Sequence, residues 1–266
     1  MATVFLGGGR ITAALVSGLW LAGDPREIVV YDRNPAKLTA LRREAKVKIA
    51  RDLKSAVAAA EILVIAVRPA SVNELLAEID RGGARPGLCV SLAAGIPLAR
   101  LKRSRGNAFA RTRWVRAMPS PVCRIARGLT ALCFERNVAK NDRARVRSLF
   151  ATVGQVVEVS ESRFDAFTVT YSSSHGYHAL ATLANAAHKA GLDRKTALVA
   201  AAHALGEAIL YWRESDSDLK ELLHEACTPG GIAAATVNAM NTSGYARVVA
   251  NGLRAGLRQA RRNAKR

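Results

Sequence analysis

The sequence has 266 residues, of which 50% are hydrophobic and 5% aromatic, and its formal net charge is +19 at pH 7. A chain of this length can bury one large core or two smaller ones, and its longest apolar run, about eight residues, is too short to cross a bilayer. The basic residues are dispersed and are not interleaved with aromatic residues, which argues against a dedicated nucleic-acid-binding protein.

The first part of the chain alternates short apolar runs with helical patterns. Strands are expected at residues 3–6, 27–32, 60–68, 88–96, 111–121, 129–135 and 155–162. Helices are expected at residues 10–23, 36–45, 71–80 and 140–154. Strands that alternate with helices predict βαβ units, a parallel sheet and a doubly wound α/β fold.

From about residue 162 onwards the sequence is rich in alanine, with a helical period and almost no strand signal. We therefore expect an α/β domain over residues 1–161 and an all-α domain over residues 162–266. Gly191 and Asp193 mark the end of one helix and the start of the next. Because such a helical domain has few large side chains for a core of its own, we expect a homodimer. Its contacts would come from Leu180–Leu210 and the terminal helix, and the last nine residues would fray.

The glycine turn Gly7-Gly8-Gly9 lies between the first strand and the first helix, and Thr12 stands at the third position of the dinucleotide fingerprint GxGxxG. Gly7 permits a tight turn, and Gly9 lets a pyrophosphate approach the helix start. The alternative is a plain turn between a strand and a helix. The strand, turn and helix context favours dinucleotide binding in a Rossmann-type domain.

Asp32 and Arg33 follow the second strand and pose the choice of cofactor. An acid at this place accepts a hydrogen bond from the ribose hydroxyls of NAD, whereas an adjacent arginine can pair with the 2′-phosphate of NADP. Asp32 would repel that phosphate. The overall positive charge and Arg33 favour NADP, and the sequence leaves both cofactors open.

Thr228-Pro229-Gly230-Gly231 stands directly before an alanine-rich helical pattern. In one interpretation Thr228 caps the helix and the glycines make the turn. In the other, the helix start exposes backbone N–H groups that bind a carboxylate or a phosphate. The residues alone do not decide between them.

Over nearly its whole length the chain resembles the pyrroline-5-carboxylate reductase family. The matching segments include FLGGGRITAALVSGL, ILVIAVRP, VSLAAGIPLARL, VRAMPSP, LFATVGQVVEVSESRFDAFT, KAGLDRKTA, TPGGIAAATVNAM and SGYARVVANGLRAGLRQA. The resemblance implies a Rossmann domain followed by a helical domain that forms an intertwined dimer. It also implies hydride transfer from a nicotinamide cofactor to the C=N carbon of a cyclic imino acid, giving proline.

The resemblance also implies roles for individual residues. The pyrophosphate would lie on Gly7, Gly9, Arg10 and Ile11. Further contacts to the cofactor would come from Val67, Arg68 and Pro69, and contacts on the nicotinamide side from Ala93, Ala94 and Gly95. Met118 and Pro119 would lie near the substrate, whose carboxylate would be bound by the loop of Thr228, Gly230 and Gly231.

Three departures from the family pattern fall at the substrate end. After the two glycines the family usually has Thr-Thr or Ala-Thr, and here Ile232 and Ala233 take their places. The second threonine, whose hydroxyl would hydrogen-bond the ring nitrogen, is therefore alanine. The family's Ser-Gly-Ser-Gly-Pro-Ala-Tyr becomes Ser172–His178, which places Ser173 and Ser174 at substrate-binding positions. Met-Pro-Asn-Thr-Pro becomes Met118-Pro119-Ser120-Pro121-Val122. The departures suggest altered substrate chemistry.

His175 is the candidate to replace the missing hydroxyl, since an imidazole can donate a proton near neutral pH. We name His175 and Thr228 as candidate catalytic residues, and the alternative is that His175 caps or packs its helix. No metal is expected, because neither His175 with His178 nor His224 with Cys227 offers a third ligand at a usual spacing.

The cysteines, Cys89, Cys123, Cys133 and Cys227, have no CxxC spacing, and no signal peptide is recognisable, so we expect reduced thiols in a cytoplasmic protein. The expected activity is NAD(P)H-dependent reduction of pyrroline-5-carboxylate. Two alternatives stay open, namely a paralogue that reduces a different cyclic imine and a cofactor-binding protein with little turnover.

Overall fold

The computed structural model describes residues 2–103 and 107–265 and divides into two compact units. The first unit is Met1–Tyr171 with Ala255–Arg266, and the second is Ser172–Arg254. The expected domain boundary after residue 161 falls at the start of helix α7 (Glu161–Thr170), which the structure groups with the first unit. Phe164 of α7 is fully buried in the core of that unit, which is why the helix belongs to it.

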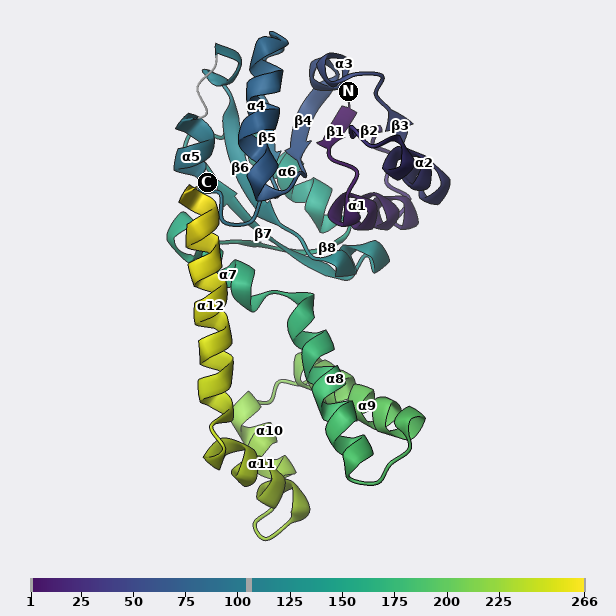
Figure 1. Cartoon of the computed structure of the whole chain (residues 1–266), viewed down its shortest axis with the longest axis vertical. Helices are drawn as coiled ribbons and strands as arrows, with labels where there is room; N and C mark the ends of the chain where they lie inside the picture. The colour runs from purple at the N-terminus through teal and green to yellow at the C-terminus, as the bar shows by residue number, and fades with distance from the viewer. Residues whose placement is uncertain (1, 104–106, 266) are drawn as a thin grey trace. The chain divides into compact units, whose positions relative to one another are not determined.

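The first unit is built around one sheet with the strand order β3-β2-β1-β4-β5-β6-β7-β8 (Figure 1). The strands are β1 (Ala2–Leu6), β2 (Ile28–Tyr31), β3 (Lys48–Ile49), β4 (Ala60–Ile65), β5 (Leu88–Ser91), β6 (Arg113–Met118), β7 (Gly128–Phe134) and β8 (Gly154–Glu158). Strands β1 to β6 are parallel, as expected. The order reverses between β1 and β4, which is where doubly wound sheets bind their ligands.

The sheet is not wholly parallel, which corrects the sequence-based expectation. Strand β7 pairs with β6 in the antiparallel direction, and β8 is parallel to β7. The link between β6 and β7 contains only the short 3₁₀ helix η3 (Pro121–Ile125). A parallel connection needs a crossover of a dozen or more residues, so this shorter link turns the chain back instead.

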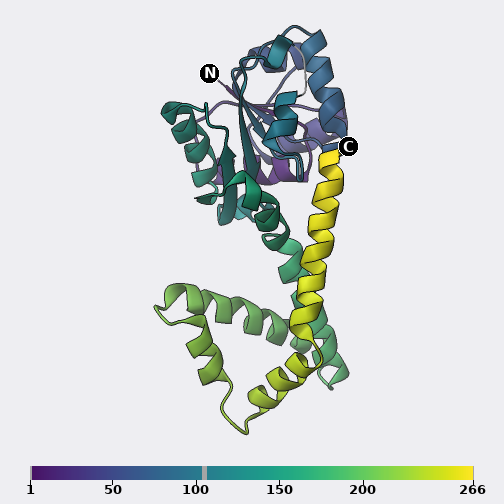
Figure 2. The same cartoon turned by 90° about the vertical axis from the view of Figure 1, so that its left-hand side faces the viewer.

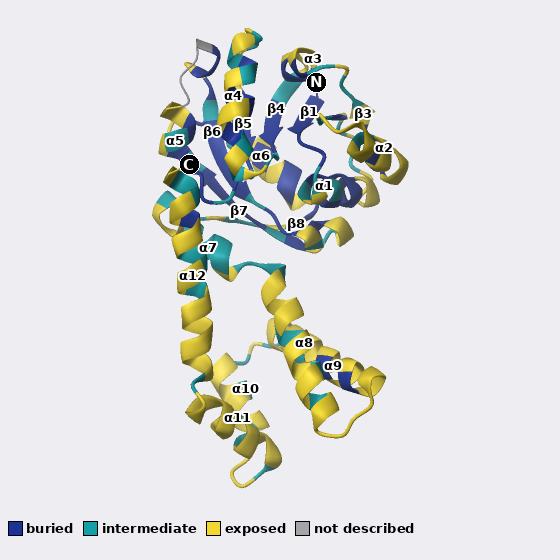
Figure 3. Cartoon of the chain, in the orientation of Figure 1, coloured by how far each residue is buried: buried dark blue, intermediate teal, exposed yellow. Residues whose placement is uncertain are grey.

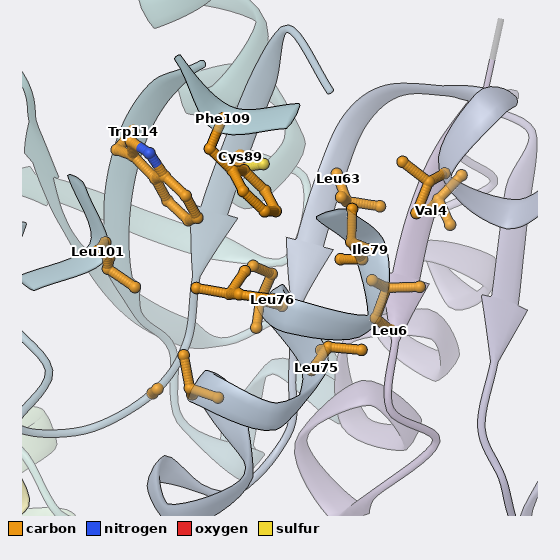
Figure 4. Close-up of a cluster of buried hydrophobic side chains, with 14 of the residues drawn as sticks. Val4, Leu6, Leu63, Leu75, Leu76, Ile79, Cys89, Leu101, Phe109 and Trp114 are labelled. Atoms are coloured by element: carbon orange, nitrogen blue, oxygen red, sulfur yellow. The ribbon is translucent and has the colours of Figure 1, made fainter. Parts of the chain in front are cut away.

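Helices cover both faces of the sheet because successive strand residues point to opposite sides. Against one face pack α3 (Leu53–Ala58), α4 (Val72–Arg81), α5 (Leu98–Arg103) and α7, around a cluster that includes Leu6, Leu63, Leu76, Phe109 and Trp114 (Figure 4). Against the other face pack α1 (Arg10–Leu21), α2 (Pro35–Glu44) and α6 (Lys140–Ala151). The doubly wound α/β fold is therefore confirmed.

The second unit consists of helices (Figure 2). They are α8 (Ser173–Lys189), α9 (Arg194–Glu214), α10 (Leu219–Ala226), α11 (Ile232–Thr242) and the first part of α12 (Tyr245–Lys265). Helices α8 and α9 pack against each other. The expected helix stop and start between them are present, since Gly191 has φ +115° and the carboxylate of Asp193 accepts the N–H groups of Lys195 and Thr196.

The second unit buries little of its own surface (Figure 3). Of the described residues 172–254, the buried ones are Ala197 and Ala201. Large apolar side chains on its helices are open to solvent, among them Leu198, Val199, Ile209, Tyr211, Leu219, Leu223 and Val248. With so few buried residues and so many exposed apolar side chains, the second unit lacks a core of its own, as its alanine content predicts.

The end of α12 differs from the expectation that the last nine residues fray. The helix continues to Lys265, and Ala260 is buried. The guanidinium of Arg100 donates to the carbonyl oxygens of Asn263 and Ala264, at 3.3 and 2.5 Å. These bonds satisfy carbonyls that a helix end otherwise leaves without partners, and so they fix the last turn. No helix among the described residues is long and apolar enough to cross a membrane.

Candidate functional site

The predicted cofactor residues of the first unit gather at one edge of the sheet, where the parallel strands end. Gly7–Ile11 follow β1, Asp32 and Arg33 follow β2, Val67–Pro69 follow β4, and Ala94 with Gly95 follow β5. Met118 ends β6, and Pro119 follows it. This edge lies at the point where the strand order reverses, the usual ligand position in such folds.

The glycine turn is held in place by its surroundings. Gly7 has φ +112°, and a Cβ on Gly7 would lie 2.7 Å from the carbonyl oxygen of Ala66. The hydroxyl of Thr12 donates to the carbonyl of Gly7 at 2.5 Å. Thr12, at the third position of the fingerprint, therefore stabilises the turn through a hydrogen bond from the first turn of α1.

The start of α1 is open to a ligand. A Cβ built on Gly9 would meet nothing within 4 Å, and no side chain caps the helix. The first N–H groups of a helix lack partners within the helix and carry partial positive charge, so they bind anions. The residues present therefore fit the pyrophosphate of a dinucleotide.

Asp32 is fixed beside this turn. Its carboxylate accepts the backbone N–H of Gly8 at 2.7 Å, the N–H of Asn34 at 2.8 Å and the ammonium of Lys37 at 3.3 Å. Burial raises the pKa of Asp32, but these donors outweigh it and hold the pKa below its ordinary value. The side chain is therefore an anion at neutral pH.

Arg33 does not stand alone at the end of β2. Its guanidinium donates to the carboxylate of Glu74 at 2.8 Å and also forms an ion pair with Glu78. Both acids lie on α4, and hydrogen bonds to Glu74 and then to Glu78 raise the pKa of Arg33. Arg33, which favoured NADP on sequence grounds, is therefore already paired with two carboxylates. The sequence pattern did not indicate these partners.

The ends of β4 and β5 form the next part of the edge. Val67 packs beside the glycine turn, its side chain 3.3 Å from a Cβ built on Gly7, while Arg68 is exposed and Pro69 begins a 3₁₀ helix. Gly95 has φ +76°, and a Cβ there would lie 2.7 Å from the carbonyl oxygen of Ala260.

Asn263 of α12 supports the loop after β5. Its side-chain amide donates to the carbonyl of Ala94 at 3.3 Å. Sequence reasoning missed this support, because Asn263 lies in the segment that was expected to fray. The only sequence signal was the helical pattern of the tail.

The end of β6 contains a second contact that sequence reasoning missed. The Tyr171 hydroxyl accepts the N–H of Leu129 at 2.6 Å and donates to the Ser120 hydroxyl at 3.1 Å. Ser120 is buried and also accepts the N–H of Val122. Ser120 lies in a segment that departs from the family pattern, and Tyr171 stands directly before the departing segment Ser172–His178.

In the second unit, the loop Thr228–Gly231 leads into α11. The N–H of Gly231 donates to the carbonyl of Thr228 at 2.9 Å, Gly230 has φ +78°, and no side chain caps the helix. Thr228 therefore does not act as the side-chain cap. The helix start is available to a carboxylate. Ile232 is 89% exposed, and Ala233 follows it on the first turn.

Ser173, Ser174 and His175 form the first turn of α8. The hydroxyl of Ser172 caps this helix, accepting the N–H of Ser174 at 3.4 Å, and the N–H of His175 donates to the carbonyl of Ser172 at 2.9 Å. The side chain of His175 is exposed. These residues and the α11 start lie in the second unit, and the cofactor edge lies in the first.

Three of the cysteines are buried thiols. Burial raises the pKa of the thiols of Cys89, Cys123 and Cys133, for Cys133 to about 12. Across residues 2–103 and 107–265, no group of three or more His, Cys, Asp or Glu side chains is arranged to hold a metal ion.

Comparison with known proteins covers both parts of the chain. Residues 3–95 match the family described as NADP oxidoreductase, coenzyme F420-dependent, and residues 161–263 match pyrroline-5-carboxylate reductase dimerisation. A pyrroline-5-carboxylate reductase from Synechocystis sp. is 30% identical over 96% of this chain and 95% of its own. One from Corynebacterium melassecola is 32% identical over 90% of each chain.

A solved structure agrees with this fold along the chain. Plasmodium falciparum pyrroline carboxylate reductase, with NADP bound, superposes with a TM-score of 0.86 and covers 99% of this chain and 98% of that chain. Its sequence identity is 20%, so it bears on the fold alone.

Proposed function

The chain belongs to the pyrroline-5-carboxylate reductase family, and on that premise we propose that it reduces pyrroline-5-carboxylate to proline. It is an NAD(P)-dependent oxidoreductase acting on a C=N bond. The observation that carries the proposal is the pair of uncapped helix starts, at α1 and α11, each behind a glycine turn. One fits the pyrophosphate and the other fits the substrate carboxylate.

The chain's own residues contribute mainly by positioning. Gly7, Gly9, Arg10 and Ile11 would hold the pyrophosphate at the start of α1, and the first N–H groups of α11 would hold the carboxylate. The dinucleotide, when bound, supplies the hydride. A proton on the imine nitrogen makes the neighbouring carbon electrophilic, and His175 is the candidate donor of that proton.

One observation favours a second candidate, a paralogue that reduces a different cyclic imine. Ala233 removes the family hydroxyl at the first turn of α11, and Ser120, which accepts a hydrogen bond from Tyr171, lies in the altered segment after β6. Departures in several substrate-end segments are expected where a site has adapted to a different ring or to a different carboxylate position.

The proposed cofactor is NADP or NAD. The positive charge of the chain supports NADP, as the sequence suggested, and the contacts of Asp32 and Arg33 oppose it. Assembly as a homodimer through the second unit is part of the proposal, as is a cytoplasmic location.

The experiment that tests the function is oxidation of NADH and NADPH against a panel of imino acids. The panel contains pyrroline-5-carboxylate, its 2-carboxylate isomer and a six-membered cyclic imine. Highest kcat/KM with pyrroline-5-carboxylate supports the first proposal, and highest kcat/KM with another imine supports the paralogue. If the protein binds dinucleotide but oxidises it with none of them, both are wrong and a cofactor-binding role is left.

A further inference from the structure

Five charged side chains form two sets of ion pairs around the two residues that follow β2. Asp32 pairs with Lys37, and Arg33 pairs with both Glu74 and Glu78. The cluster therefore has one more carboxylate than cation, although the chain as a whole is strongly basic.

The position of Asp32 matters because an acid at this strand end accepts a hydrogen bond from the 2′-hydroxyl of the adenosine ribose. A carboxylate has about four acceptor positions on its two oxygens. Three are used here, by the N–H groups of Gly8 and Asn34 and the ammonium of Lys37. One acceptor position is left, which suits a ribose hydroxyl and offers nothing to a phosphate.

Arg33 is the cation that could bind the 2′-phosphate of NADP, but it is ion-paired with two residues of α4. Glu74 and Glu78 are four residues apart on α4 and so share one face of the helix. Each takes a different guanidinium nitrogen, Nη1 for Glu74 and Nη2 for Glu78. A phosphate that recruited Arg33 would displace these carboxylates or sit beside them, and it carries nearly two negative charges at pH 7.

We propose that Asp32, Glu74 and Glu78 make this enzyme prefer NADH over NADPH, with Glu74 and Glu78 withholding Arg33 from the 2′-phosphate. The inference rests on the proposed function only in taking a nicotinamide dinucleotide as the ligand. Asp32 sets the preference by direct contact with the ribose, and the two glutamates set it through Arg33.

The test measures dissociation constants for NADH and NADPH by calorimetry, with no imine present. Adenosine 2′,5′-bisphosphate and 5′-ADP serve as further probes of the 2′ position. We expect the wild-type protein to bind NADH at least about tenfold more tightly than NADPH at low salt, with the difference shrinking towards 1 M salt. Tighter binding of NADPH than of NADH at low salt would overturn the inference.

The variant Glu74→Gln/Glu78→Gln removes both charges and releases Arg33. It should tighten NADPH binding about tenfold while changing NADH binding less than about twofold. Adding Arg33→Met to this variant should cancel the gain. The side chains of Arg33, Glu74 and Glu78 are 57%, 62% and 33% exposed, so the substitutions leave the core intact.

The matched control is Glu61→Gln/Glu158→Gln. These glutamates also pair with arginines, Arg145 and Arg147, each at 2.6 Å, and they lie at the start of β4 and on the edge strand β8. The control makes the same change in net charge away from the end of β2 and should leave the NADH to NADPH ratio unchanged. An equal shift in the control, or no shift in the α4 variant, contradicts the inference. If the wild-type protein binds neither NADH nor NADPH, both this inference and the proposed function are wrong.

Discussion

Gly7 and Gly9 belong to one turn but are glycines for different reasons. Gly7 has a positive φ and no room for a Cβ, whereas Gly9 has φ −79° and open space around it. Gly7→Ala should therefore cost about 1–3 kcal/mol of stability through backbone strain. Gly9→Val should fold normally and lose dinucleotide binding, because its side chain would occupy the space of the pyrophosphate.

Thermal unfolding and NADH titration of both variants separate the two effects. A Gly9→Val protein that keeps its melting temperature and its NADH affinity would show that the pyrophosphate does not lie on this turn. Gly7→Ala is the control for strain, since its loss of stability requires no ligand.

Ala233 and His175 give opposite predictions for the substrate end. A restored hydroxyl bond to the imine nitrogen is worth roughly 0.5–1.5 kcal/mol, or about 2–13-fold in kcat/KM. Ala233→Thr should raise turnover of pyrroline-5-carboxylate by that factor if the enzyme uses the family geometry and Ile232 leaves room for the threonine.

If His175 has become the proton donor, Ala233→Thr should change little, and His175→Ala should cost about 10²-fold or more. Steady-state kinetics with pyrroline-5-carboxylate distinguishes the two cases, and His178→Ala on the same helix is the control. Should neither substitution alter turnover of any imine that the protein reduces, both assignments at this end are wrong.

Single residues were predictable where the backbone defines their role. Gly7, Gly9 and Asp32 follow from their places after strands, and the structure puts all three at the expected edge. The partners of Arg33 were not predictable, because Glu74 and Glu78 come from a different βα unit and only the fold brings them near. Tyr171 and Asn263 were missed for the same reason, since each acts through a contact distant in sequence.

At the scale of elements, α7 is fixed to the sheet by one buried cation. The side chain of Arg116 on β6 is 2% exposed, and it pairs with Glu161 at 2.9 Å and Asp165 at 2.8 Å. Its guanidinium also lies 4.2 Å from the ring centroid of Phe164. A buried cation without its partners is costly, so α7 should lose stability when both carboxylates are neutralised.

We predict that Glu161→Gln/Asp165→Asn lowers the free energy of unfolding by an amount near the lower end of about 3–5 kcal/mol, since the two acids are partly exposed. Glutamine keeps an acceptor for the N–H of Leu98, which donates to Glu161. Adding Arg116→Met should restore most of the loss, because it removes the unpaired charge and keeps the apolar contacts. Denaturant unfolding at one fixed protein concentration measures this, and a triple variant no more stable than the double would contradict it.

The order and type of the main elements followed from the hydrophobic periodicity and the turn residues. The direction of strand β7 and the end of helix α12 did not. Strand β7 has an ordinary strand pattern, and only the shortness of its link to β6 makes it antiparallel. The last turn of α12 has no strong stop signal of its own. It is ordered because Arg100, far away in sequence, binds its carbonyls.

At the scale of the whole molecule, the two units have different balances of buried and exposed surface. The sheet unit has two extensive buried clusters, one on each face. In the helical unit Leu198 and Val199 of α9 are 50% and 62% exposed, and Val248 of α12 is 64% exposed. Large exposed apolar side chains in this number are typical of an interface, and the matched dimerisation family covers these helices.

We therefore predict a homodimer that forms through α9, its neighbour α8 and α12. Leu198→Arg should weaken the dimer, because a charge placed in an apolar interface loses its water without gaining a partner. Leu21→Arg is the control, since Leu21 is a 60% exposed leucine of the sheet unit. Light scattering coupled to size-exclusion chromatography at micromolar concentration should give twice the 28.4 kDa chain mass for the wild type and for the control. For Leu198→Arg it should give a mass that falls towards the monomer on dilution. A wild-type protein that is monomeric at this concentration, with its helical circular dichroism intact, would show that the helical unit is stable without a partner.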